Sequence, residues 1–254
     1  MSIEITIMGL LIGFLVGLTG VGGAALLTPI LIMIGVQPSI AVGTDLLYNS
    51  VTKFFGVMQH WKQKTVNLTL VKYLAIGSIP SAVVAVGALH FFGSMYQNQE
   101  EIIKSALGYV LILVSLATIA RVFFDKKLRP NRWQLAPIEE KKGLTIGIGI
   151  VFGFIVGLTS IGSGSLFAVA MLYLYRMNAS ELVGTDIAHA FLLVTVAGVL
   201  HAGTGSVDYM LAGNLLLGSI PGVVLGSTLS AKVPARPLRT IVATLILISG
   251  LKLI

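Results

Sequence analysis

The chain has 254 residues, of which 56% are apolar and 11% are charged, and its mean hydropathy is +0.95. This composition excludes a water-soluble surface, so most of the chain is expected to face lipid or other protein groups. The sequence contains no cysteine, which excludes disulfides and thiolate chemistry, and its formal charge of +7 is expected to mark membrane orientation, not a nucleic-acid partner.

Several segments are long enough to cross a bilayer as helices, which takes about 20 apolar residues. The full spans are predicted at residues 40–59, 68–92, 102–124, 180–200 and 209–229, with a shorter sixth at 240–254. The sequence therefore predicts an all-α polytopic membrane protein.

Two pairs of shorter apolar segments surround glycine-rich stretches. Segments 3–18 and 24–36 flank the sequence TGVGG, and segments 144–158 and 166–175 flank TSIGSGS. Neither member of a pair comfortably crosses the bilayer, so each pair is predicted to form a re-entrant helical hairpin. An alternative counts the glycine-rich pieces as spans and gives seven or eight helices.

The chain repeats itself. The motif GFLVGL at 13–18 returns as GFIVGL at 153–158, and Gly43-Thr44-Asp45 returns as Gly184-Thr185-Asp186. We predict two membrane repeats, residues 1–124 and 144–254, joined by a charged linker at 125–143. Duplication on this scale is typical of transporter folds.

The cations predict how the repeats are oriented, because short cytoplasmic loops are enriched in Lys and Arg. Twelve cations fall in four connections: Lys62, Lys64, Lys126, Lys127, Arg129, Arg132, Lys141, Lys142, Arg176, Lys232, Arg236 and Arg239. If each repeat is a re-entrant hairpin plus three transmembrane helices, all twelve lie on the cytoplasmic side, with the linker, and the repeats are inverted. Four crossings per half would make the repeats parallel and scatter these charges over both faces.

The hairpin tips are candidate binding sites for an anion. Non-helical backbone at membrane depth leaves amide groups that a ligand, water or protein must satisfy, and a helix N-terminus favours negative charge. The second tip adds hydroxyl donors. The alternative is that small residues at the tips only allow helices to pack closely. The tip candidates are Thr19, Gly20, Gly22, Gly23, Thr159, Ser160, Gly162, Ser163 and Ser165.

Asp45 and Asp186 lie at matching places inside predicted spans, where ionisable groups are costly and usually face a cavity or a partner. Asp45, Asn49 and Lys53 share one helix face, but Asp45 and Lys53 are about 12 Å apart along the axis. Lys53 is therefore expected to pair with Asp186 of the other half or with a transported anion. A purely structural buried ion pair is the alternative. His189, one turn after Asp186, is a candidate for proton coupling with both aspartates.

These residues resemble the sulfite exporter TauE/SafE family of bacterial membrane permeases over essentially the whole chain. The resemblance rests on the glycine-rich stretch 13–23, the segment 41–44 and the second copies at 153–165 and 183–185. The second copy departs from the family pattern, because Ser163 replaces Gly23 and Pro29 has no proline counterpart. Aspartates follow both Gly-Thr pairs where a smaller polar residue is expected.

The resemblance implies a secondary transporter, usually an exporter, of sulfur-containing anions such as sulfite, sulfoacetate or other organosulfonates. It implies a multi-pass protein of the bacterial inner membrane, with alternating access around a central site and coupling to a proton or ion gradient. Thr44 and Thr185 of the Gly-Thr pairs join Asn49, Lys53 and the tips as candidate substrate-binding residues. No cofactor, metal site or enzymatic centre is expected. An anion channel, or a permease for a non-sulfur organic anion, is the alternative function.

Overall fold

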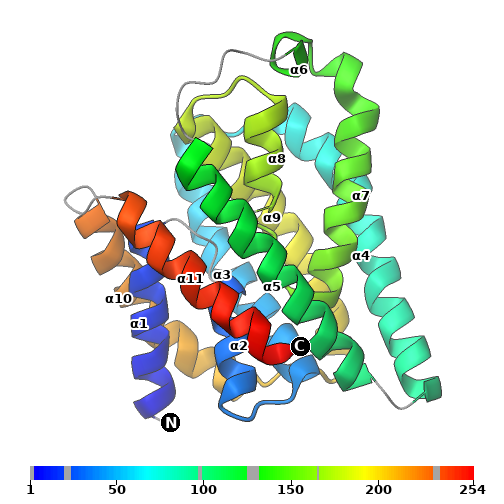
Figure 1. Ribbon diagram of the computed structural model, residues 1–254, viewed down its shortest axis with the longest axis vertical. Coiled ribbons are helices and arrows are strands. Elements are labelled where there is room, and N and C mark those ends of the chain that lie inside the picture. Colours follow the sequence, from blue (N-terminus) through cyan, green and yellow to red (C-terminus); the bar gives the residue numbers. More distant parts are fainter. Residues whose placement is uncertain (1–2, 20–23, 97–98, 125–131, 165, 231–234) are drawn as a thin grey trace.

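The computed structural model describes residues 3–19, 24–96, 99–124, 132–164, 166–230 and 235–254, and helices dominate these ranges (Figure 1). In chain order they are α1 (Ile3–Thr19), α2 (Ala24–Met33), α3 (Pro38–Lys62), α4 (Leu68–Tyr96), α5 (Gln99–Phe124), α6 (Arg132–Leu135), a 3₁₀ turn η1 (Glu139–Lys141), α7 (Lys142–Thr159), α8 (Leu166–Leu174), α9 (Ala179–Gly203), α10 (Tyr209–Ser230) and α11 (Ala235–Leu253). The predicted all-helical fold is confirmed, and each predicted segment has its helix.

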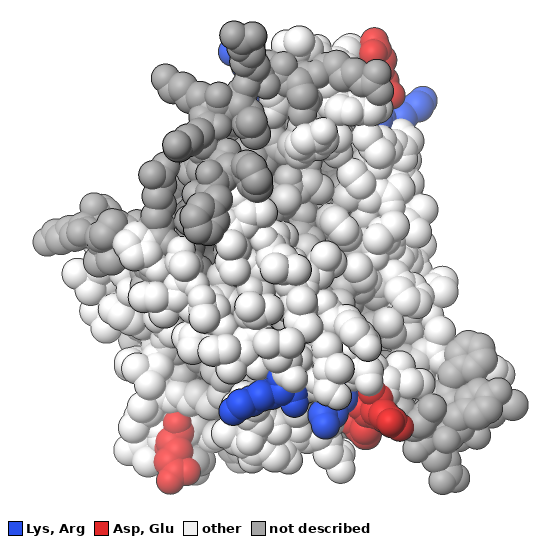
Figure 2. Space-filling view, in the orientation of Figure 1, with Lys and Arg blue, Asp and Glu red and all other residues white. Residues whose placement is uncertain are grey.

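Within the described ranges, five stretches are long and apolar enough to cross a membrane: Leu68–Phe91, Glu100–Ala120, Glu139–Thr159, Ser180–Gly203 and Tyr209–Gly226. Charged side chains gather toward the two ends of the face that Figure 2 shows, with an uncharged zone between them. That distribution suits a protein whose middle is surrounded by lipid. α3 has 25 residues but is absent from this set, since its polar residues lower its hydropathy.

The two glycine-rich pairs form helices of unequal length. At 1.5 Å per residue, α2 and α8 are each about 15 Å long, about half of a bilayer core. The expectation that residues 144–158 are too short to cross is wrong, because η1 and α7 together form the 21-residue stretch Glu139–Thr159. Re-entry of the hairpins from the two surfaces stays a prediction.

The repeated GFLVGL and GFIVGL motifs bring backbones of the two halves together. α1 packs chiefly on α10, and α7 packs chiefly on α4. A Cβ atom added to Gly13 would lie 2.5 Å from the carbonyl oxygen of Ser219, and one added to Gly153 would lie 2.4 Å from that of Ser78. Any side chain at these positions would collide with backbone, so glycine is required for this packing.

Equivalent helices of the two halves meet at the centre and run antiparallel. Between α3 and α9, the Ser50 and Thr195 hydroxyls are 2.7 Å apart. The Phe54 and Phe191 rings lie at 5.9 Å, so residue numbers rise along α3 as they fall along α9. This is the arrangement that an inverted repeat requires. In Figure 1 the N-terminus and the α2–α3 turn lie at the lower end of the molecule, and α6 lies at the upper end.

The glycine contacts predict which small-to-large substitutions the fold tolerates. Gly153→Ala should lower the melting temperature, since overpacking costs about 1–3 kcal/mol. Gly147→Ala in the same helix is the matched control, because a Cβ atom there meets nothing within 4 Å. Thermal unfolding of the detergent-purified variants measures both. Equal melting temperatures would contradict the close approach of α4 and α7.

The antiparallel arrangement also predicts which loops share a side of the membrane. Gln63 and Thr204 are exposed, equivalent residues that follow α3 and α9. Because the chain has no cysteine, single cysteines placed at these positions report topology without background labelling. A membrane-impermeant thiol reagent should label them from opposite faces. Labelling of both from one face would contradict the inverted orientation.

Candidate functional site

The carboxylate of Asp45 is the centre of a buried polar cluster on α3. Asp45 is fully buried, and its Oδ2 accepts a hydrogen bond of 2.7 Å from the Thr28 hydroxyl of α2. The Ser160 hydroxyl, from the turn after α7, donates to the same oxygen. Asn49 Nδ2 donates to Asp45 Oδ1 at 2.7 Å. The cluster therefore joins α2 and α3 of the first half to the glycine-rich tip of the second.

The second tip enters this cluster because α7 ends in a left-handed turn. Ser160 is the C-cap of α7 with φ 61°, and Gly162 follows with φ 107°, a region that glycine adopts without strain. Thr159 is used locally, since its hydroxyl donates to Ile155 O and accepts from Ile161 N. Ser163 is buried in the same turn.

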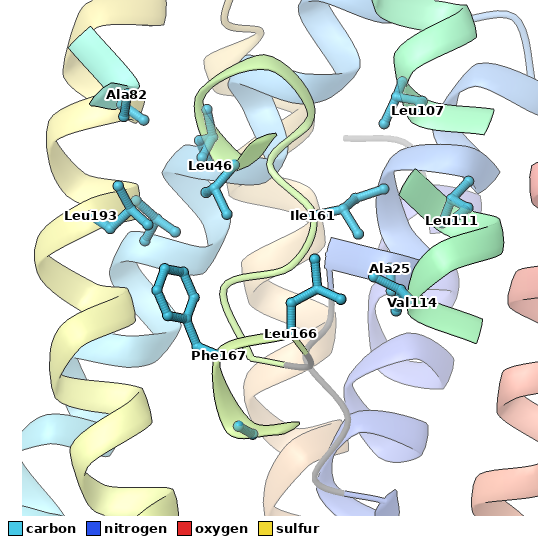
Figure 3. Packing of buried hydrophobic residues seen from close by; sticks show 14 of the residues in the cluster. Ala25, Leu46, Ala82, Leu107, Leu111, Val114, Ile161, Leu166, Phe167 and Leu193 are labelled. Carbon is cyan, nitrogen blue, oxygen red and sulfur yellow. The ribbon is translucent and has the colours of Figure 1, made fainter. Parts of the chain in front are cut away.

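Apolar side chains hold this turn in the middle of the molecule. Figure 3 shows Ile161, Leu166 and Phe167 between α3 and α9 on one side and Ala25 with α5 on the other. Ile161 and Phe167 are both fully buried. The second glycine-rich bend is thus enclosed by helices of both halves, away from bulk solvent.

Lys53 connects the two predicted carboxylates electrostatically. It is half-buried on α3, and the negative charges of Asp186 of α9 and of Asp45 both favour its ammonium form. Asp186 is itself buried. The pairing of Lys53 with a counter-charge of the other half stays a prediction. The equivalent position in the second half is Val194, which is fully buried, so the lysine of α3 has no counterpart in α9.

His189 lies beside this group and is fully buried. Its Nε2 is 2.8 Å from the Ser78 hydroxyl of α4, and its ring packs at 4.4 Å from that of Phe167 in the first turn of α8. Among the described residues, His189 Nδ1 has no hydrogen-bond partner. This nitrogen is therefore a buried polar atom without a hydrogen bond in the described part of the chain, next to the helix that begins at Leu166.

The threonines of the two Gly-Thr pairs have the same structural role in both halves. The Thr44 hydroxyl accepts a 3.0 Å hydrogen bond from the backbone N–H of Asp208, and the Thr185 hydroxyl accepts one of 3.0 Å from Asn67. Asp208 and Asn67 in turn accept from the first turns of α10 and α4. Each threonine therefore anchors the start of a helix of the opposite half, and its hydroxyl oxygen already accepts one hydrogen bond.

Part of the predicted site lies outside the described residues. Gly20, Gly22 and Gly23 of the first tip and Ser165 of the second belong to this part, as does the side chain of Thr19 at the end of α1. Hydrogen bonds bring together Asp45, Asn49 and Ser160, whereas Lys53 interacts electrostatically with Asp45, Asp186 and His189.

Two residues of the cluster were not predicted from the sequence. Thr28 is a hydroxyl in the otherwise apolar helix α2, and Ser78 belongs to a GSIP motif that recurs at 218–221. Because a buried hydroxyl needs a hydrogen-bond partner, a threonine within an apolar helix could have indicated that Thr28 bonds another polar group of the interior. The Ser78 motif reads as a helix kink from sequence alone.

The occupied hydroxyls predict that the Gly-Thr threonines affect stability more than ligand affinity. Thr44→Val removes the acceptor for Asp208 N–H and should cost about 1 kcal/mol of stability. Ligand affinity should stay unchanged. Thermal unfolding combined with a binding assay measures both quantities. If Thr44→Val lowers the ligand affinity and leaves the melting temperature unchanged, Thr44 binds substrate and the prediction is wrong.

Comparison with known proteins agrees with this architecture. The family described as Sulfite exporter TauE/SafE matches residues 5–253. The chain is 70% identical over 254 residues, all of both chains, to the probable membrane transporter protein YjnA of Bacillus subtilis (strain 168). It is 26% identical to the probable membrane transporter protein YunE of the same organism, covering 98% of this chain and 96% of that one. No solved structure matches significantly. The chain therefore belongs to the sulfite exporter TauE/SafE family and is a membrane transporter.

Proposed function

We propose that this protein is a secondary transporter of sulfur-containing anions such as sulfite, sulfoacetate or other organosulfonates, with export as the net direction. The family description and the relatives' names support a membrane transporter. We further propose that it lies in the bacterial inner membrane, with residues 125–143 in the cytoplasm. The cations of that linker support this orientation.

The observation that carries the anion assignment is Lys53. An ammonium group in the middle of a bundle is costly unless a carboxylate or a ligand compensates it. Here the carboxylates of Asp186, from the opposite half, and of Asp45 compensate its charge in part. A lysine between two halves is suited to hold an oxyanion, because its charge attracts the anion and its three donors serve the oxygens.

The start of α8 supplies a second group of features that suit an anion. The N-terminal end of a helix carries partial positive charge, so the first turn of α8 favours a negative ligand. His189 Nδ1, which has no partner among the described residues, lies next to Phe167 in that turn. We propose that the anion sits between Lys53 and the first turn of α8.

We propose alternating access around this site, and the packing of the two halves supports it. α3 packs on α9 at the centre. α1 of the first half packs on α10 of the second, and α7 of the second half packs on α4 of the first. Rocking of one half against the other would expose the centre to each side in turn, which is the common mechanism of transporters built from repeats.

An anion channel, or a permease for a non-sulfur organic anion, is the alternative. A channel moves anions only down their gradient and does not saturate at a slow turnover. Proteoliposomes loaded with sulfite, sulfoacetate, acetate or lactate separate the three cases. Saturable transport against a gradient, selective for the sulfur anions, supports the proposal.

Removal of the Lys53 charge tests the site directly. Lys53→Met should weaken the apparent affinity for sulfite or sulfoacetate at least tenfold, about 1.4 kcal/mol, while the protein remains folded. Lys72→Met is the matched control, because Lys72 is an exposed lysine of α4. Initial transport rates in proteoliposomes give both affinities.

Unchanged affinity in Lys53→Met would overturn the proposed role of Lys53. An equal loss in Lys72→Met would show that the effect reflects general surface charge. A melting temperature within the range of the native protein excludes misfolding as the cause.

A further inference from the structure

Two hydroxyl groups from separate segments meet one carboxylate oxygen in the buried centre, so that three oxygen atoms form a triangle. Asp45 Oδ2 receives the Thr28 hydroxyl at 2.7 Å and the Ser160 hydroxyl as well, and these two hydroxyl oxygens are 3.4 Å apart. All three side chains are fully buried. Asn49 holds the other carboxylate oxygen and so fixes the orientation of the carboxylate.

Such a triangle has the ligand chemistry of a small hard cation. A hydroxyl that donates to a carboxylate can rotate and offer a lone pair to a metal ion. Hard cations prefer carboxylate, hydroxyl and carbonyl oxygens. A proton would need only the carboxylate, whereas a metal ion would also use the lone pairs of the two hydroxyls from α2 and the α7 turn. The described residues hold no group of three or more His, Cys, Asp or Glu, as a site for a transition metal commonly has.

The end of α7 adds an electrostatic preference for a cation. α7 ends at Thr159, and Ser160 is its C-cap. The last carbonyl groups of a helix lack partners within the helix, and the C-terminal end carries partial negative charge. Ends of broken helices coordinate the coupling cation in many transporters. This end suits a cation, whereas the start of α8 suits the anion.

The charges at the centre point the same way. Two carboxylates, those of Asp45 and Asp186, interact with the one ammonium group of Lys53. If both carboxylates are ionised, the formal charges of these three groups sum to −1. A monovalent cation at Asp45 would bring the group to neutrality. An incoming anion would then meet Lys53 without net repulsion, which links the two binding events.

The second half does not repeat this triangle. The alignment of the halves places Ala168 or Val169 opposite Thr28, and neither side chain has an oxygen. The position of Thr28 therefore has no hydroxyl counterpart in α8. The ligand set argued here belongs to the Asp45 side of the centre.

We propose that Asp45, Thr28 and Ser160 form a Na⁺ site, and that Na⁺ bound there couples to transport of the anion. The coupling rests on the proposed function, whereas the binding of Na⁺ does not. The small triangle favours Na⁺ over the larger K⁺.

The binding test uses the full-length purified protein without any sulfur anion. Thermal unfolding is followed as NaCl replaces choline chloride or KCl at constant ionic strength, and ²²Na⁺ binding gives the stoichiometry. A ligand that binds the folded state raises the melting temperature by mass action. We expect a saturable rise with Na⁺ and not with K⁺, and one ²²Na⁺ per chain.

The variants locate the site. Asp45→Asn should abolish the Na⁺ effect, and Thr28→Val and Ser160→Ala should each weaken the apparent Na⁺ affinity at least tenfold. Ser50→Ala is the matched control, because it removes a hydroxyl of α3 that bonds Thr195 instead. Its Na⁺ affinity should equal that of the native protein. Since Asp45→Asn risks misfolding, the two hydroxyl variants carry the test independently.

Absence of a Na⁺ effect, or native Na⁺ affinity in both hydroxyl variants, would overturn the proposal. Stabilisation that depends on pH but not on Na⁺ would also overturn it and assign a proton to Asp45. Na⁺ binding without transport of sulfite or sulfoacetate would leave the Na⁺ site in place and refute the proposed function.

Discussion

The hydrogen bonds that Asp45 accepts from Thr28 and Ser160 are the contact on which the centre of this protein depends. A carboxylate in the interior is tolerated only where donors or charges compensate it, and non-helical backbone at membrane depth is tolerated only where protein encloses it. One interaction meets both requirements. It fixes the broken backbone between α7 and α8, and it ties that bend to α2 and α3 of the opposite half.

Around this contact, the duplicated scaffold is symmetrical in its packing and asymmetrical in its chemistry. The threonines Thr44 and Thr185 make the same bond in both halves, and Gly13 and Gly153 make the same backbone contact. Lys53, by contrast, corresponds to Val194. Duplication of this lysine would be unfavourable, because a second ammonium at the centre would repel the first in a medium of low dielectric constant. The residues that recur in both halves therefore form the scaffold, and the residues that differ between the halves form the site.

The sequence predicted the helical elements closely because apolar run length is a local property. The predicted segments 68–92 and 209–229 became α4 and α10 with starts at Leu68 and Tyr209. The error at α7 has a local cause too, since η1 extends the helix through charged residues that looked like linker. The site was predicted in part. Asp45, Asn49 and Ser160 meet, but the partnership of Thr28 was missed, because α2 reads as uniformly apolar apart from one hydroxyl and Pro29.

The sequence by itself determined the class of the protein, its duplication and the intramembrane polar residues, because composition, repeats and helix periodicity can be read without knowledge of neighbours. Only the tertiary structure decided what those residues do. The Thr44 hydroxyl is occupied by a backbone N–H, and the Ser160 hydroxyl by a carboxylate more than a hundred residues away. A hydrogen bond depends on where two helices cross, and the crossing of α3 with the α7–α8 turn is set by the packing of the whole bundle.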